Sequence, residues 1–115
     1  MEFGQKLRKL REERGISQQE LAKKLGYKSN SYIFDIENGD FIPSEDKLKK
    51  LAKALRIPFS RMKDMMLESK LEDMGIKDPR FIGMFKDYSR LGEEDKEAIA
   101  KVYLEIREAK LGAGA

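Results

Sequence analysis

The sequence has neither cysteine nor histidine among its 115 residues. Without thiols it forms no disulfide bonds, and without thiolates and imidazoles it lacks the usual protein ligands of zinc. The same two absences remove the most common nucleophile and general base of enzymes. Catalysis would have to rest on carboxylates or lysines alone, so we expect no enzyme, no metal and no cofactor.

Long hydrophobic runs are also missing. No apolar stretch approaches the ~20 residues that a transmembrane helix needs, and no charged-then-apolar leader stands at the N-terminus. These absences predict a protein without membrane contacts, located in the cytoplasm. The apolar share of 40% and the charged share of 39% favour a helical protein dense in ion pairs over a β-sandwich.

Positive charge is concentrated in the first half of the chain. Residues 1–58 hold 13 Lys and Arg against 9 Asp and Glu, whereas residues 59–115 hold 11 against 12. An excess of four positive charges on a small domain suits a polyanionic partner. Solubility alone explains the same excess about as well.

Hydrophobic periodicity predicts helices throughout the chain and no strand. Ser17 and Glu20 form a capping box at the start of the second expected helix. Ser29 is the expected N-cap of the third, which Gly39 ends, and a fourth is expected after Pro43. The four segments of the first half are FGQKLRKLREERG, ISQQELAKKLG, SNSYIFDIENG and PSEDKLKKLAKAL.

The third expected helix, residues 29–38, has a mixed polar face. Ile33 and Ile36 form a narrow apolar stripe that we expect to face the core. A rotation of about 100° per residue puts a set of polar and aromatic side chains on the opposite, exposed face. These residues are Asn30, Ser31, Phe34, Asp35 and Asn38, with Tyr32 at the margin.

Three more helices are expected in the second half, beginning after Pro58, at Pro79 and at Glu93. The methionines of this half either fill the core or form an adaptable partner surface. The last two helices carry too many large apolar residues to lie free in water. They either fold back on residues 1–58 or pair with the same segment of a second chain. The apolar residues are Phe81, Ile82, Phe85, Ile99, Val102, Tyr103 and Ile106.

The segments RKLREERGISQQELAKKLG, SYIFDIENG and PSEDKLKKLAKAL, in this order and spacing, resemble the helix-turn-helix of the phage repressor and Cro-like family. Its members are also called xenobiotic-response-element (XRE) regulators. The resemblance covers residues 3 to about 58. It implies an all-α fold, a lambda-repressor-like helix-turn-helix bundle followed by C-terminal helices. It also implies a DNA-binding domain at residues 1–58 and a dimerisation region at residues 59–115.

The resemblance further implies that a homodimer binds double-stranded DNA, with the helix at residues 29–38 in the major groove of the operator. Arg11 and Glu37 match a buried ion pair of the family. The residues implied to contact bases or phosphates are Gln18, Lys28, Ser29, Asn30, Ser31, Tyr32, Asp35 and Asn38. The dimer contact is expected within residues 79–111, at Phe81, Phe85, Ile99, Val102, Tyr103 and Ile106.

Some positions depart from the family pattern. The turn YKSN is one residue longer than the commonest one, and Asp40 and Phe41 stand where many members carry basic phosphate contacts. Asp35 adds negative charge to the expected DNA face, which weakens attraction to phosphates.

Two functions therefore remain open: a DNA-binding transcriptional regulator, specifically a repressor, or a protein-interaction module acting as antagonist or adaptor. Phe34 suits either contact with a thymine methyl group or cover for a neighbouring segment such as Phe41.

Overall fold

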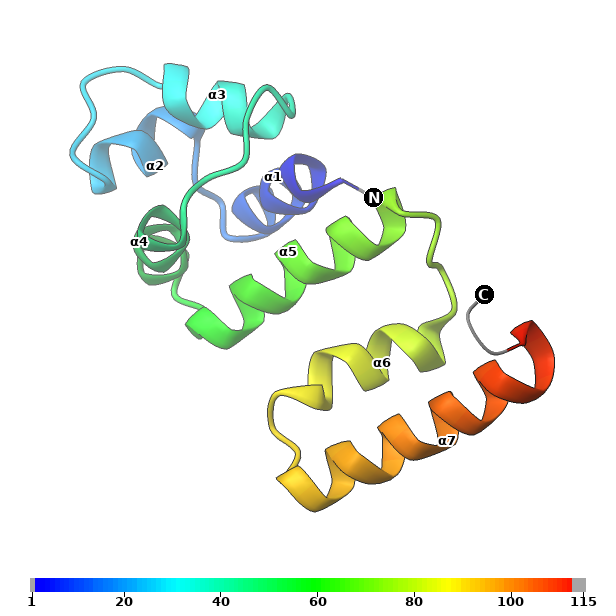
Figure 1. The fold of residues 1–115 in the computed structure, drawn as a ribbon. Helices are drawn as coiled ribbons and strands as arrows, with labels where there is room; N and C mark the ends of the chain where they lie inside the picture. The colour runs from blue at the N-terminus through cyan, green and yellow to red at the C-terminus, as the bar shows by residue number, and fades with distance from the viewer. Residues whose placement is uncertain (1, 113–115) are drawn as a thin grey trace. The chain divides into compact units, whose positions relative to one another are not determined.

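The computed structural model describes residues 2–112, which form seven helices and no strand. The predicted all-α fold is confirmed. The chain divides into two compact units, of which the first ends at Asp78 and the second begins at Pro79. The helices are α1 Phe3–Glu13, α2 Gln18–Lys24, α3 Ser31–Glu37, α4 Glu45–Leu55, α5 Phe59–Asp73, α6 Pro79–Tyr88 and α7 Glu93–Leu111 (Figure 1).

Two helix starts in the first unit follow directly from local sequence. At α2 the Ser17 hydroxyl accepts a hydrogen bond from the Glu20 backbone, and the Glu20 carboxylate accepts one from the Ser17 backbone. This is the predicted capping box. At α4 the Ser44 hydroxyl accepts a hydrogen bond from the Lys47 backbone N–H at 3.3 Å. Both bonds satisfy amide groups that the first helical turn leaves without a partner.

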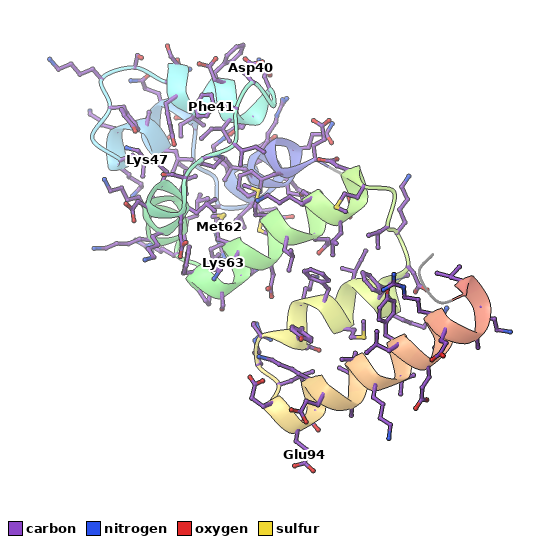
Figure 2. The ribbon with its side chains drawn as sticks, viewed as in Figure 1. Asp40, Phe41, Lys47, Met62, Lys63 and Glu94 are labelled. Carbon is purple, nitrogen blue, oxygen red and sulfur yellow. The ribbon has the colours of Figure 1, made fainter. Side chains whose placement is uncertain are left out.

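The core of the first unit lies between α1, α2, α3, α4 and α5. α1 packs against α3 and α5, and α4 packs against α5. Met62 and Met66 of α5 are buried in this core, so the core-filling role predicted for the methionines is confirmed for these two. Figure 2 labels Met62 on α5. The α5 helix thus packs with the helices of the expected DNA-binding domain, although it lies beyond residue 58. The side chains with almost no exposed surface are Leu7, Leu21, Ile33, Ile36, Leu51, Leu55 and Met62.

Helix α1 approaches the C-terminal end of α3 unusually closely at Gly4. A Cβ atom placed on Gly4 would lie 2.7 Å from the carbonyl oxygen of Glu37, and closer still to that of Ile36. Both neighbours are backbone atoms, which cannot rotate away as a flexible side chain does. The absence of a side chain at Gly4 therefore allows the close approach of α1 to α3.

Replacing Gly4 with alanine is expected to lower the free energy of unfolding by about 1–3 kcal/mol, because α1 and α3 must separate to admit the methyl group. Urea denaturation measures this change. Gly83→Ala is the matched control: Gly83 lies in α6, and an added Cβ there meets no atom within 4 Å. Alanine is the better helix former, so the control is expected to be neutral or slightly stabilising. Equal effects of the two substitutions would contradict the close approach.

The second unit buries very little. Ile82 is its one buried residue among those described, and the 19 residues of α7 include none. Lys96 of α7 lies over the ring of Tyr88 of α6, with its Nζ 5.2 Å from the ring centroid. Ile99 is half-buried, whereas most of the other large apolar side chains are exposed. The exposed ones are Phe81, Met84, Phe85, Tyr88, Val102, Tyr103, Leu104, Ile106 and Leu111.

None of the described helices is both long and apolar enough to cross a bilayer.

Candidate nucleic-acid interface

The helix α3 begins later than its sequence predicted. We expected an N-cap at Ser29, but α3 starts at Ser31 and Asn30 occupies the N-cap position. The Ser29 hydroxyl lies 3.2 Å from the Ser31 hydroxyl and accepts a hydrogen bond from the Ser31 backbone N–H at 3.5 Å. Ser29 therefore closes the longer turn instead of capping the helix, which corrects the expected helix at residues 29–38.

The two faces of α3 are divided as its periodicity predicted. Ile33 and Ile36 have at most 1% of their surface exposed, so α3 is held by its apolar stripe. The side chains opposite the stripe are all at least partly accessible to solvent. Ser31, Phe34 and Asn38 are exposed, and Asn30 and Asp35 are half-buried.

A buried ion pair holds α3 to α1. The Arg11 guanidinium donates two hydrogen bonds to the Glu37 carboxylate, from Nε to Oε2 at 2.7 Å and from Nη2 to Oε1 at 3.0 Å. Its Nη1 donates a third bond to the carbonyl oxygen of Ile16 at 2.8 Å. The bonds to Glu37 raise the pKa of Arg11 above its ordinary value, against a smaller lowering caused by burial. The pair joins α1, the turn before α2 and the end of α3.

The Glu37 carboxylate also begins a chain of hydrogen bonds that reaches the surface. Its Oε1 accepts a bond from Gln18 Nε2 at 3.1 Å, and Gln18 Oε1 accepts one from Asn30 Nδ2 at 3.2 Å. Each amide keeps one N–H that these bonds do not use, and Asn30 keeps its carbonyl oxygen. Gln18 and Asn30 are thus brought together and oriented at the start of α3. This contact was missed from the sequence, because positions 18 and 37 carry no pattern that pairs them.

A second cluster, which we call the aromatic cluster, is linked to α3 through Tyr32. It consists of Tyr27, Tyr32, Phe41 and Lys47. The rings of Tyr27 and Tyr32 stack with centroids 4.8 Å apart, and those of Tyr32 and Phe41 lie 5.3 Å apart. The Lys47 ammonium donates a hydrogen bond of 2.6 Å to the Tyr27 hydroxyl. Figure 2 marks Phe41 in the loop after α3 and Lys47 on α4.

The aromatic cluster explains how the longer turn is accommodated. Tyr27, in this turn, packs against Tyr32 of α3 and is fixed from α4 by Lys47. Burial raises the pKa of the Tyr32 hydroxyl, with a smaller contribution from Tyr27, so the ring stays neutral at ordinary pH. Tyr32, expected near a base or phosphate, is half-buried in this cluster. The sequence indicated the long turn but not the lysine that anchors it.

Charges of both signs border the exposed face of α3. Lys23 and Lys24 of α2 and Lys28 of the turn are exposed. Asp40, which Figure 2 labels after α3, is exposed as well. Asp35 is half-buried. Within residues 2–112, no group of three acidic side chains is placed to hold a metal ion.

Comparison with known proteins identifies the domain that carries this surface. Residues 7–61 match the model of a helix-turn-helix family, from within α1 to the first turn of α5. A search among curated proteins found no similar sequence. Domains of this type imply DNA binding and are typically not catalytic. The short α2, the turn and α3 described above are the helix-turn-helix itself. Residues 7–61 of this chain are therefore a helix-turn-helix domain of the XRE, or Cro-like, family, followed by further helices.

Proposed function

We propose that this protein is a sequence-specific transcriptional regulator, specifically a repressor, that binds operator DNA as a homodimer with α3 in the major groove. The observation that carries the proposal is the Asn30 amide, which Gln18 holds at the start of α3 by a hydrogen bond of 3.2 Å. A side chain fixed before binding loses little conformational entropy when it meets a base. An amide held in this way is already oriented for a partner at the surface.

The other residues take roles that follow from their chemistry. Asn30 has an N–H and a carbonyl oxygen free to bond adenine N7 and N6. Ser31 donates to or accepts from a base, and Asp35 accepts from cytosine N4. The remaining polar residues, together with the lysine of the turn, contact phosphates at the border of the groove. These are Gln18, Lys28, Ser29 and Asn38, with Tyr32 supporting α3 from behind.

The homodimer is proposed through α6 and α7, because their exposed apolar surface suits a second copy. Half-exposed side chains of this kind offer together roughly 500–800 Å² per chain, which approaches the about 800 Å² per partner of a stable interface. Residues 79–115 carry seven basic and seven acidic side chains, so two copies meet without net repulsion. The first unit, which carries a net positive charge, then remains available to bind DNA. Two domains joined in this way would read two half-sites.

Replacing Asn30 or Gln18 with alanine is expected to weaken binding to the preferred duplex by about 1–3 kcal/mol, or about five- to 150-fold. The duplex is first selected from random DNA, and affinity is measured by fluorescence anisotropy at fixed salt. Because the two amides bond to each other, the double variant should lose less than the sum of the single losses. Gln5→Ala, which removes an exposed amide on α1, should bind normally. Unaltered affinity of both single variants would exclude docking of α3 in the groove.

A second candidate function is a protein-interaction module built on the same domain. The observation that favours it is the exposure of Phe34, Phe41 and Ile42, of which Ile42 is 66% exposed, near the acidic Asp35 and Asp40. The dependence of affinity on salt separates the two functions. Neutralised phosphates predict a steep linear fall of log affinity with log salt concentration, whereas an apolar protein contact predicts a shallow one.

A further inference from the structure

The ring of Phe34 lies on the exposed face of α3, where it flanks Ser31 and Asn38. It is 50% exposed, although its neighbours one turn away on either side are the polar residues Asn30 and Asn38. No other described aromatic ring contacts it. Phe41, which the sequence offered as its cover, packs instead against Tyr32 at 5.3 Å. Phe34 is therefore a surface residue of α3, and no described aromatic ring of this unit covers it.

The chemistry of the major groove offers one apolar group at the edges of the bases. This is the methyl group on C5 of thymine, or the same group on 5-methylcytosine. The polar groups on these edges donate or accept hydrogen bonds, which a phenyl ring cannot replace. A ring on the groove-facing side of α3 therefore either meets a 5-methyl group or excludes water from polar base edges without replacing the lost bonds.

We propose that Phe34 is a specificity-determining residue that packs on the 5-methyl group of a pyrimidine in each half-site. The inference rests on the proposed docking of α3 and adds one element to it: a required methyl group. Phe34 follows Asn30 by four residues, which advance about 6 Å along a helix at a rise of about 1.5 Å per residue. Successive base pairs are about 3.4 Å apart, so the methyl group lies within one or two base pairs of the base that Asn30 contacts.

The test removes single methyl groups from the preferred duplex. Each thymine in turn is replaced by deoxyuridine, which keeps every hydrogen-bonding group and lacks only the methyl. For the wild-type chain, one thymine in each half-site should be sensitive, with affinity about fourfold lower per methyl, as expected for one buried methyl group. Phe34→Ala should bind the thymine duplex more weakly and lose the sensitivity at that position. Phe34→Leu, which keeps an apolar side chain, should retain part of it.

Ile42→Ala is the matched control, because Ile42 is also exposed but lies in the loop after α3. It should keep the full response to deoxyuridine. If no thymine is sensitive but methylation of one cytosine tightens binding in a Phe34-dependent manner, 5-methylcytosine supplies the group and the proposal holds.

The proposal is overturned if the duplex binds normally and Phe34→Ala responds to every deoxyuridine as the wild type does. That result would leave the DNA-binding function intact. If the selection yields no preferred duplex, the proposed function itself fails and the inference falls with it. Capture of a protein that is lost on Phe34→Ala would then assign the ring to a protein contact and likewise overturn the proposal.

Discussion

Replacement of Glu37 by glutamine is expected to lower the free energy of unfolding of the first unit by about 3–5 kcal/mol. The substitution leaves the Arg11 guanidinium buried, with 8% of the residue exposed, and removes the negative charge that it faces at 2.7 Å. A neutral amide cannot replace both charge-assisted bonds. Urea denaturation of the full chain measures the loss, and amide hydrogen exchange in α1 and α3 assigns the transition to the first unit.

The chain provides a matched control for this experiment. Arg8 and Glu12 form an exposed ion pair of 2.9 Å on α1, so Glu12→Gln removes the same charge from a solvated pair. Its expected cost is below about 0.5 kcal/mol. A double variant, Arg11→Met with Glu37→Leu, should recover much of the loss, because no buried charge then remains unpaired. If Glu37→Gln costs no more than Glu12→Gln, the pair does not stabilise the domain as we infer.

The second large effect is expected in the second unit. Replacing Ile106 with aspartate should convert the proposed dimer to a monomer at micromolar concentration and weaken operator binding about 100-fold. A carboxylate in the centre of an apolar interface loses its hydration without gaining a partner, and one half-site alone supplies only part of the affinity. Light scattering gives the mass of the variant, and anisotropy on the selected duplex gives its affinity.

Leu104 supplies the control on the same helix. It is 54% exposed and Ile106 is 55% exposed, but helical periodicity places Leu104 away from the stripe that holds Ile99, Val102 and Ile106. Leu104→Asp should therefore leave both mass and affinity unchanged. A wild-type chain that is monomeric while still binding DNA tightly would show that α6 and α7 serve another purpose.

The parts of the fold that sequence reasoning predicted are those that short-range chemistry decides. The capping box at Ser17 and Glu20 involves residues three apart, and the burial of Ile33 and Ile36 follows from helical periodicity. Both can be seen in a short window of sequence. The start of α3 was misplaced because Ser29 looks like an N-cap but is used within the turn.

The candidate site was predicted as a set of residues but not as an arrangement. The sequence placed Asn30 and Gln18 on the expected DNA surface, yet their mutual hydrogen bond depends on how α2 and α3 pack. Lys47 illustrates the same limit. It lies 20 positions from Tyr27, and the hydrogen bond between them depends on how α4 packs against α2, which precedes the turn. Gly4 gives no local signal either, since a glycine inside a helix looks only like a weak helix former.

The carbonyl oxygen of Gln18 also restricts how this surface can change its preference. Glu37 holds the Gln18 amide so that its oxygen faces position 30. Lysine, arginine or glutamine introduced at position 30 would donate a hydrogen bond to the Gln18 oxygen. Lysine and arginine bind guanine. An aspartate or glutamate at position 30 has no hydrogen to donate, so its carboxylate would be repelled by the Gln18 carbonyl oxygen. Re-targeting by substitution at this position should thus yield purine readers readily, and cytosine readers only when residue 18 is changed as well.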